Sequence, residues 1–192
     1  MLKWIGGCLV LVVVVIAAAS WYALRTMRES LAPDGSARVM IAAPRERIYA
    51  SLSNGDSIRT WMAQGNAVTT WRTGPLVVGD SIRVELRRSI GSPRPLIWRV
   101  SQLVPNRLVA MEIMTPETRR VMGVRKDSLV GVGDSTLVIS TVTSAMLSDT
   151  ANTGTAAVAA DMMLSMFRLQ SKLEHQGLKG RIEGRPKTET SR

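Results

Sequence analysis

The chain has 192 residues, 45% of them hydrophobic, and a formal net charge of +10 at pH 7. This length suits one domain of ordinary size with appendages, and the hydrophobic content excludes a disordered chain. With one cysteine, Cys8, and one histidine, His175, an intramolecular disulfide is excluded and a zinc or iron site is not expected. The positive charge favours an anionic partner, either a membrane surface or nucleic acid.

Residues 4–24 form a run of 21 uncharged, mainly apolar residues. About 20 apolar residues suffice for a helix to cross the hydrocarbon layer, and aromatic residues stand at both ends of this run. We therefore predict a single-pass transmembrane anchor over residues 1–25 and a linker over residues 26–36. A cleaved signal peptide is the alternative, because small residues at 17–20 resemble a cleavage site. We expect the domain outside the cytoplasm, with the cytoplasmic face as the alternative.

After the linker, residues 37–43 are expected to form a first strand. Pro44 favours the start of a short helix, and Asp56 is expected to cap a second short helix over residues 57–63. Beyond Gly65 the hydrophobic period changes from helical to alternating. Six strands are predicted, over residues 67–73, 81–90, 96–104, 107–114, 120–130 and 136–143. Their short connecting turns indicate an antiparallel meander.

The last predicted element is a long amphipathic helix over residues 156–179. Polar residues such as Ser165 and His175 form one stripe on it, which we expect to face solvent. Met166 and Leu173 belong to the opposite, apolar side, which must pack against a partner. The apolar face of the sheet supplies that partner. The predicted fold class is therefore α+β, a curved antiparallel sheet closed by its C-terminal helix, with a disordered basic tail after it in residues 180–192.

Two stretches of the predicted domain carry a recognisable pattern. Residues 41–49 read IAAPRERIY, with Leu52, Asn54 and Trp61 after them, and residues 133–136 read GDST before the last strand. Together with the order of elements, they resemble the START-like (SRPBCC) superfamily, particularly its polyketide cyclase/dehydrase and lipid-transport group. The resemblance is taken to cover a domain over residues 37–179.

That resemblance implies a helix-grip fold, in which the sheet wraps the long helix and leaves an apolar cavity. Members of the superfamily bind lipids, sterols, polyketides or quinones, and some catalyse cyclisation or dehydration. No catalytic motif is shared across the family, so the resemblance assigns no catalytic residue to this chain.

The expected ligand is a hydrophobic small molecule, such as a lipid, a quinone or a polyketide-like compound. Large, adaptable aromatic and thioether side chains are the candidates to line its cavity. These candidates are Trp61, Trp71, Trp98, Met111, Met122, Met163 and Met166. The simpler interpretation, that each of them only fills the core, stays open.

Basic residues concentrate between residues 80 and 126, where ten Arg or Lys outnumber four Asp or Glu. Beside a membrane anchor, an outward basic face is suited to anionic head groups, although a solvated face is the simpler interpretation. The candidates for membrane-surface contact are Arg25, Arg28, Arg83, Arg87 and Arg99. Nucleic acid is not expected as a partner, because no aromatic residues are interleaved with the arginines for stacking.

Enzyme chemistry has little support in the sequence. His175 falls on the predicted polar stripe, and Glu112 is out of phase with Met111 and Ile113, so both are expected to face solvent. No Ser-His-Asp or Cys-His set can be assembled. We therefore expect a membrane-anchored domain that binds a hydrophobic small molecule without a metal or cofactor. A cyclase- or dehydrase-like enzyme using the same cavity, and a protein-interaction module without a ligand, are the alternatives.

Overall fold

A computed structural model describes residues 14–15, 36–62, 66–70, 72–86, 94–144 and 154–184 of the chain. Its elements are β1 (Ala37–Ile41), α2 (Arg45–Leu52), α3 (Gly55–Trp61), β2 (Asn66–Thr70), β3 (Ser81–Leu86), β4 (Arg94–Val104), β5 (Leu108–Met114), β6 (Val121–Val132), β7 (Ser135–Ser144) and α5 (Gly154–Ile182). The strands form one seven-stranded sheet in the order β1-β7-β6-β5-β4-β3-β2, and each neighbouring pair is antiparallel.

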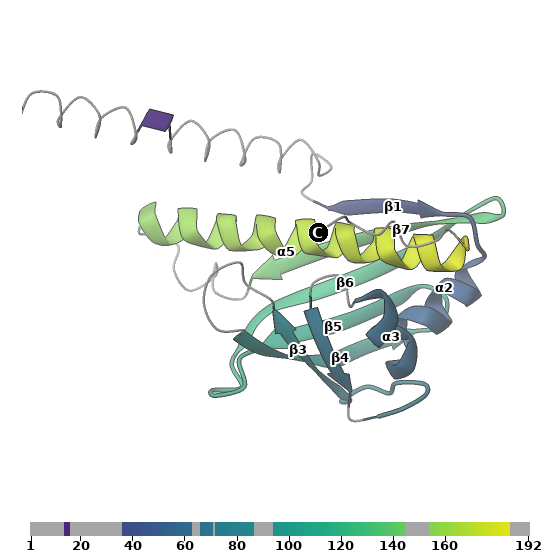
Figure 1. Cartoon of the computed structure of the whole chain (residues 1–192), viewed down its shortest axis with the longest axis horizontal. Coiled ribbons are helices and arrows are strands. Elements are labelled where there is room, and N and C mark those ends of the chain that lie inside the picture. The colour runs from purple at the N-terminus through teal and green to yellow at the C-terminus, as the bar shows by residue number, and fades with distance from the viewer. Residues whose placement is uncertain are drawn as a thin grey trace, which may run out of the picture.

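The sheet curves beneath the C-terminal helix. Figure 1 shows α5 lying along β1 and β7, with α2 and α3 beside the sheet towards the end of α5. The helix α5 packs mainly against β1, β7 and α3. The predicted α+β class, with a curved antiparallel sheet and a C-terminal helix, is therefore confirmed, and the arrangement is consistent with a helix-grip fold. The gap between α5 and the sheet holds the core.

The two short helices begin at residues that suit a helix start. Pro44 is the N-cap residue of α2, as its fixed backbone angle favours. The predicted cap of the next helix was wrong, because Asn54 and not Asp56 caps α3: its side-chain oxygen accepts the N–H groups of Asp56 and Ser57 at 3.0 and 3.1 Å. The Asp56 carboxylate instead accepts the N–H of Gly74 at 2.8 Å, which ties α3 to the loop before β3.

A tight hairpin sets the register of the two strands beneath α5. Gly133, with φ at 57°, begins the two-residue turn between β6 and β7, where a positive φ matches the twist of the strands. Val132 therefore pairs with Ser135, and the ladder continues to Gly123 and Ser144. Because side chains alternate along a strand, one face of β6 is turned towards α5. Its buried members are Gly123, Arg125, Asp127 and Leu129.

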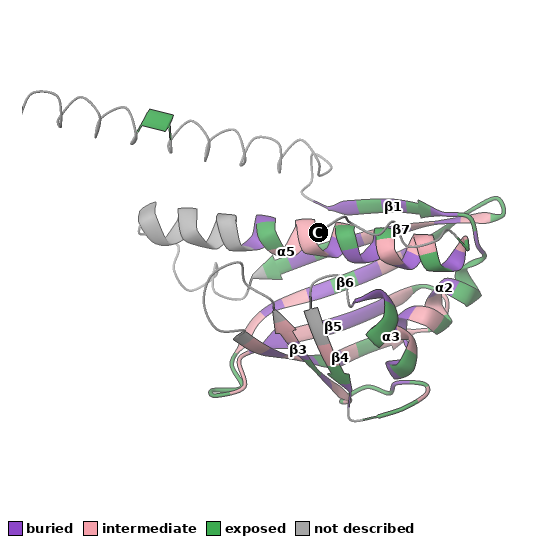
Figure 2. Cartoon of the chain, viewed as in Figure 1, coloured by how far each residue is buried: buried purple, intermediate pink, exposed green. Residues whose placement is uncertain are grey.

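The predicted orientation of the long helix was wrong. Met166 and Leu173, expected to pack on the sheet, are 57% and 43% exposed. The buried face instead consists of Leu164, Ser165, Ser171, Glu174, His175, Leu178 and Ile182. Figure 2 shows buried and exposed positions alternating along this part of α5. Polar side chains can be buried here because Glu174 and His175 find polar partners on β6.

The predicted anchor, residues 1–25, lies outside the described residues apart from Val14 and Val15, which are helical and exposed. No helix in the described ranges is both long enough and apolar enough to cross a bilayer. Only Ser36 of the predicted linker is described. At the other end, α5 continues to Ile182, so the predicted tail begins inside the helix, and residues 185–192 lie outside the described part.

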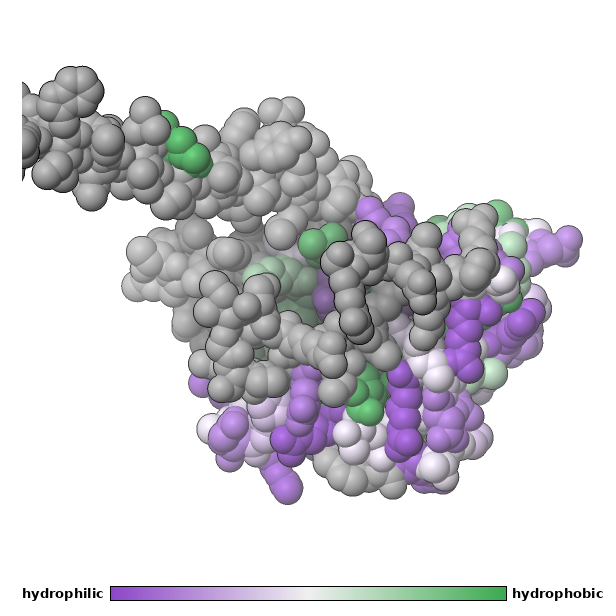
Figure 3. All heavy atoms as spheres, viewed as in Figure 1, coloured by the Kyte–Doolittle hydropathy of each residue, from purple (hydrophilic) through white to green (hydrophobic). Residues whose placement is uncertain are grey.

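The outer face of the sheet is polar where the sequence predicted it to be. Arg83 and Arg99 are exposed, and Arg99 forms an ion pair with Glu112 on the neighbouring strand. Glu112 is accordingly turned away from the core, as expected. Figure 3 shows mainly hydrophilic side chains over the described part of one face of the molecule. Contact with a membrane surface stays a prediction, and Arg25, Arg28 and Arg87 lie outside the described residues.

Candidate functional site

Four ionisable side chains form a buried cluster between the sheet and the helix. Arg125 and Asp127 come from β6, and Glu174 and His175 come from α5; none is more than 5% exposed. Arg125 Nε donates to both carboxylate oxygens of Asp127, at 3.1 and 3.0 Å, and Arg125 Nη1 donates to Glu174 Oε2. The Nη2 atom of Arg125 lies 3.1 Å from His175 Nε2, which lies 3.4 Å from Asp127 Oδ1.

The cluster keeps its strongest charges despite burial. Burial alone raises the pKa of a carboxyl group, but the Arg125 guanidinium outweighs it and holds the pKa of Asp127 well below its usual range. Burial likewise opposes the charge of Arg125, and the carboxylates of Asp127 and Glu174 more than compensate, so the pKa of Arg125 is raised. The Ser140 hydroxyl helps to stabilise the Asp127 carboxylate, although no hydrogen bond of good geometry joins them.

Two tryptophans enclose the cluster, and only one of them has its N–H group satisfied. Trp61 stacks against His175, with ring centroids 6.5 Å apart, and its Nε1 donates to the Ser51 carbonyl oxygen at 3.1 Å. The guanidinium carbon of Arg125 lies 5.3 Å from the centre of the Trp98 ring, a cation–π contact. In the described ranges, neither Trp98 Nε1 nor His175 Nδ1 has a hydrogen-bond partner.

His175 Nε2 lies between a donor and an acceptor of the cluster. Arg125 Nη2 can only donate to it, whereas Asp127 Oδ1 can only accept from it, so the role of this nitrogen depends on the tautomer of the ring. Around it, one guanidinium group is paired with two carboxylates. Among the described residues, no group of His, Cys, Asp or Glu side chains is arranged to hold a metal ion. The side chains of the cluster can make hydrogen bonds and can transfer protons.

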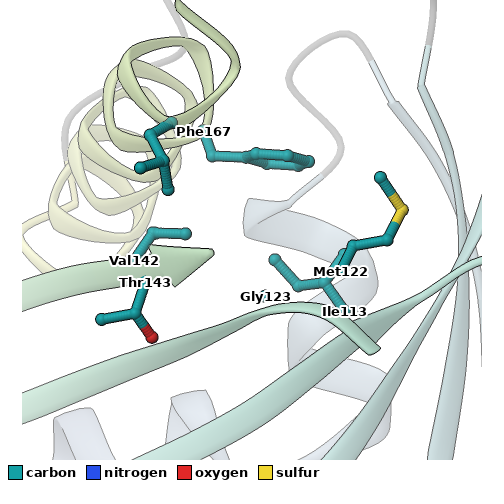
Figure 4. A pocket seen from close by; sticks show the side chains of 7 residues that line it. Ile113, Met122, Gly123, Val142, Thr143 and Phe167 are labelled. Atoms are coloured by element: carbon teal, nitrogen blue, oxygen red, sulfur yellow. The ribbon is translucent and has the colours of Figure 1, made fainter. Parts of the chain in front are cut away.

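Figure 4 shows a small apolar pocket between α5 and the sheet. It is lined by Ile113, Met122, Gly123, Val142, Thr143, Leu164 and Phe167. Phe167 reaches from α5 across to the side chains of β5 and β6 in Figure 4. The empty volume of the pocket is about 210 Å³ when the part open to solvent is counted. The enclosed part of the pocket has room for about one water molecule.

Strand register places this pocket directly against the cluster. Val142, which lines the pocket, is the pairing partner of Arg125 on the neighbouring strand. Ile113, which also lines it, pairs with Trp98. Gly123 lies two residues before Arg125 on the same inward face of β6, and a glycine there leaves space between strand and helix. The apolar pocket and the buried polar groups are thus adjacent parts of one gap.

The structure places the predicted cavity-lining residues in three different environments. Trp61, Trp98 and Met111 are buried in the core, whereas Met122 lines the pocket and Met166 is exposed. Trp71 and the side chain of Met163 lie outside the described residues. Whether any of these residues binds a ligand stays a prediction. The buried ionic cluster and the two tryptophans that contact it occupy another part of the gap between α5 and the sheet.

The cluster was not predicted from the sequence, although part of its signal was present there. Arg125 and Asp127 share the strand phase of Leu129, a core residue, which places both charges on the inward face. Glu174 and His175 precede Leu178 by four and three positions, the spacing of neighbours on one helix face. These patterns were outweighed by the expectation that charged residues lie at the surface.

No protein-family model matches the chain, and no curated protein matches it either. Solved structures do share its fold. Protein Ms6760 from Mycobacterium smegmatis matches with a TM-score of 0.58 and 12% identity over 78% of this chain and 90% of its own. KanY matches with a TM-score of 0.59 and 14% identity, over 78% and 97%. CalU16 from Micromonospora echinospora matches with a TM-score of 0.50 and 16% identity, over 79% and 75%. At these identities the likeness shows a shared fold alone.

Proposed function

We propose that this chain binds a small, mainly apolar molecule in the gap between α5 and the sheet. The observation that carries this proposal is the adjacency of an apolar pocket to buried polar groups. Burying four ionisable side chains in a domain core stabilises it little, and apolar side chains of similar volume often serve as well or better. A cluster retained at that cost, beside a pocket with an inward-facing glycine, suits a site in which a few polar groups orient an otherwise apolar ligand.

Binding requires the gap to open beyond the state described. Sites for small organic ligands commonly measure about 300–1,000 Å³, which exceeds the volume of this pocket. Met122 and Phe167 are both half-buried, and they lie on opposite sides of the pocket. Methionine repacks readily, and Phe167 is only partly buried against the core. Movement of these two side chains is therefore the expected route by which a ligand enters.

We further propose that this domain lies beside a membrane, because residues 4–24 are uncharged, mainly apolar and long enough to span one as a helix. A membrane anchor would bring the pocket close to a source of apolar compounds. Lipids, quinones and polyketide-like compounds remain the candidate ligand classes. The basic outer face containing Arg83 and Arg99 is the part of the described surface suited to anionic head groups.

Native mass spectrometry of the full-length chain, extracted from the cells that express it, tests the binding proposal. We expect a small molecule to co-purify with the wild type. Gly123→Val puts two methyl groups into the pocket and should abolish that co-purification. Gly131→Val, on the same strand and face but exposed, is the matched control, because its new side chain meets only the flexible end of Arg45. Equal recovery of the molecule from all three proteins, or from none, would contradict the proposal.

A cyclase- or dehydrase-like enzyme is the second candidate, and His175 favours it. A carboxylate beside one imidazole nitrogen and an unpartnered second nitrogen form the usual arrangement of a general acid or base. Masses of co-purified compounds distinguish the two functions. An enzyme that removes water should leave a compound one water heavier bound to a His175→Gln variant. A binding protein should carry the same compound in both proteins.

A further inference from the structure

The buried N–H group of Trp98 indicates what kind of polar group the ligand carries. The indole nitrogen is a donor only, so it cannot be satisfied by another donor. Trp98 is 2% exposed and its Nε1 atom has no partner in the described part of the chain. Nearly all buried polar groups in folded proteins are hydrogen-bonded, and an exception needs an explanation. A bound molecule that supplies a hydrogen-bond acceptor would explain the unpaired N–H group of Trp98.

The pocket adjoins the pair of strands that carries Trp98. Trp98 and Ile113 are direct partners across β4 and β5, and Ile113 lines the pocket. Arg125 covers the face of the Trp98 ring, and its strand partner Val142 lines the pocket as well. Paired residues of neighbouring strands have their side chains side by side on one face of the sheet. Trp98 is therefore next to the lining of the pocket, and a molecule that widens the pocket towards the ionic cluster reaches it.

The charge of the cluster decides which acceptors are tolerated. The positive charge of Arg125 is already paired with two carboxylates, those of Asp127 and Glu174, so it is not free to bind an anionic ligand. Such a ligand would lose its hydration on burial and would lie beside two carboxylates without a cation of its own. A neutral acceptor meets no such penalty. The same cluster that supplies polar groups thus disfavours a free carboxylate.

We propose that the site selects a neutral molecule whose carbonyl-type oxygen accepts the Trp98 Nε1–H, with an apolar body in the pocket. Ketones, quinones and lactones carry such an oxygen, whereas free fatty acids at neutral pH carry an anionic one. This inference rests on the proposed ligand binding and adds the class of ligand to it. A hydrogen bond to an otherwise unsatisfied donor should favour such a ligand about five- to tenfold over one without the oxygen.

Three probes with equal numbers of carbon atoms test the inference: methyl heptyl ketone, nonanoate and nonane. Each is added to full-length chain labelled with nitrogen-15 in its tryptophans, and the indole signals are followed by nuclear magnetic resonance. The Trp98 signal is identified by its loss in Trp98→Phe. We expect the ketone to shift that signal, to bind about five- to tenfold more tightly than nonane, and to bind at least about tenfold more tightly than nonanoate.

The two tryptophan variants separate this role from a structural one. Trp98→Phe keeps an aromatic ring for Arg125 but removes the N–H, so the preference for the ketone over nonane should disappear. Trp61→Phe removes an N–H that already has Ser51 as its partner, so it should keep that preference. Nonanoate binding as tightly as the ketone, or a ketone preference that survives in Trp98→Phe, would overturn the inference. Equal binding of ketone and nonane overturns only this inference, whereas failure of all three probes overturns the proposed function too.

Discussion

Removal of Arg125 should be among the most damaging single changes in this domain. Arg125→Met keeps much of the side-chain volume but deletes the hydrogen bonds to both oxygens of Asp127 and to Glu174. Two carboxylates then remain buried without their positive partner. Breaking a buried ion pair in this way costs about 3–5 kcal/mol of unfolding free energy. That is a large part of the about 5–15 kcal/mol that stabilises a typical protein.

Urea unfolding of the full-length chain, followed by circular dichroism, measures this loss. The matched control is Arg99→Met, because Arg99 also pairs with a carboxylate from a neighbouring strand, Glu112, but is half-exposed. Exposed pairs contribute about 0–1 kcal/mol. If the two variants lose equal stability, then the cluster is not a desolvated ion network and the reasoning fails.

A triple variant separates the stability of the cluster from its role. Arg125→Met, Asp127→Leu and Glu174→Leu together replace every charge by an apolar side chain, so no carboxylate is left unpaired. We expect most of the stability lost by Arg125→Met to return, since such replacements are often neutral or stabilising. A triple variant as unstable as the single one would show that packing, and not charge, explains the loss.

Two further predictions concern pH and backbone space. The pKa of Asp127 in the folded state lies below the value of about 3.9 for an unfolded aspartate. Its stabilisation is therefore complete above that value and is lost as the pH falls through the folded pKa. Acid unfolding of Asp127→Asn should accordingly depend less on pH between about pH 5 and pH 2 than that of the wild type, and equal slopes would contradict this. Gly55→Ala would place a Cβ atom 2.4 Å from the Arg72 carbonyl oxygen and should cost about 1–3 kcal/mol. Gly180→Ala in α5 meets no atom within 4 Å and should stabilise by about 0.5–1 kcal/mol; thermal unfolding of both variants checks the contrast.

Local signals predicted the fold well because the residues that carry them act on their own neighbours. The fixed φ of Pro44 favours the start of a helix at that position, and Gly133 supplies the positive φ that its hairpin needs. Alternation of apolar residues placed the strands to within a few residues. These effects depend only on neighbouring residues, so they can be predicted from the sequence.

The candidate site was not predictable in this way, because its partners are far apart in the sequence. His175 is polar, so helix periodicity alone placed it outside, while Met166 and Leu173 are apolar and were placed inside. Their true positions depend on Arg125, which lies 49 residues before Glu174. The alternation of side chains along β6 indicated that Arg125 points inward, on the same face as Leu129. Alternation does not show which residues of another element lie opposite that face.

The last turn of α5 is tied to the first strand of the domain. Lys179 Nζ donates to the Met40 carbonyl oxygen at 2.8 Å, and the Ala42 N–H donates to Glu183 Oε1 at 2.9 Å. During synthesis on the ribosome, β1 therefore emerges long before β7, its pairing strand, and α5, since β7 starts at Ser135. At about 5–20 residues per second, that delay lasts roughly 5–20 s. The nascent chain must carry an unpaired apolar strand for this time, which makes it a candidate substrate for chaperones during synthesis.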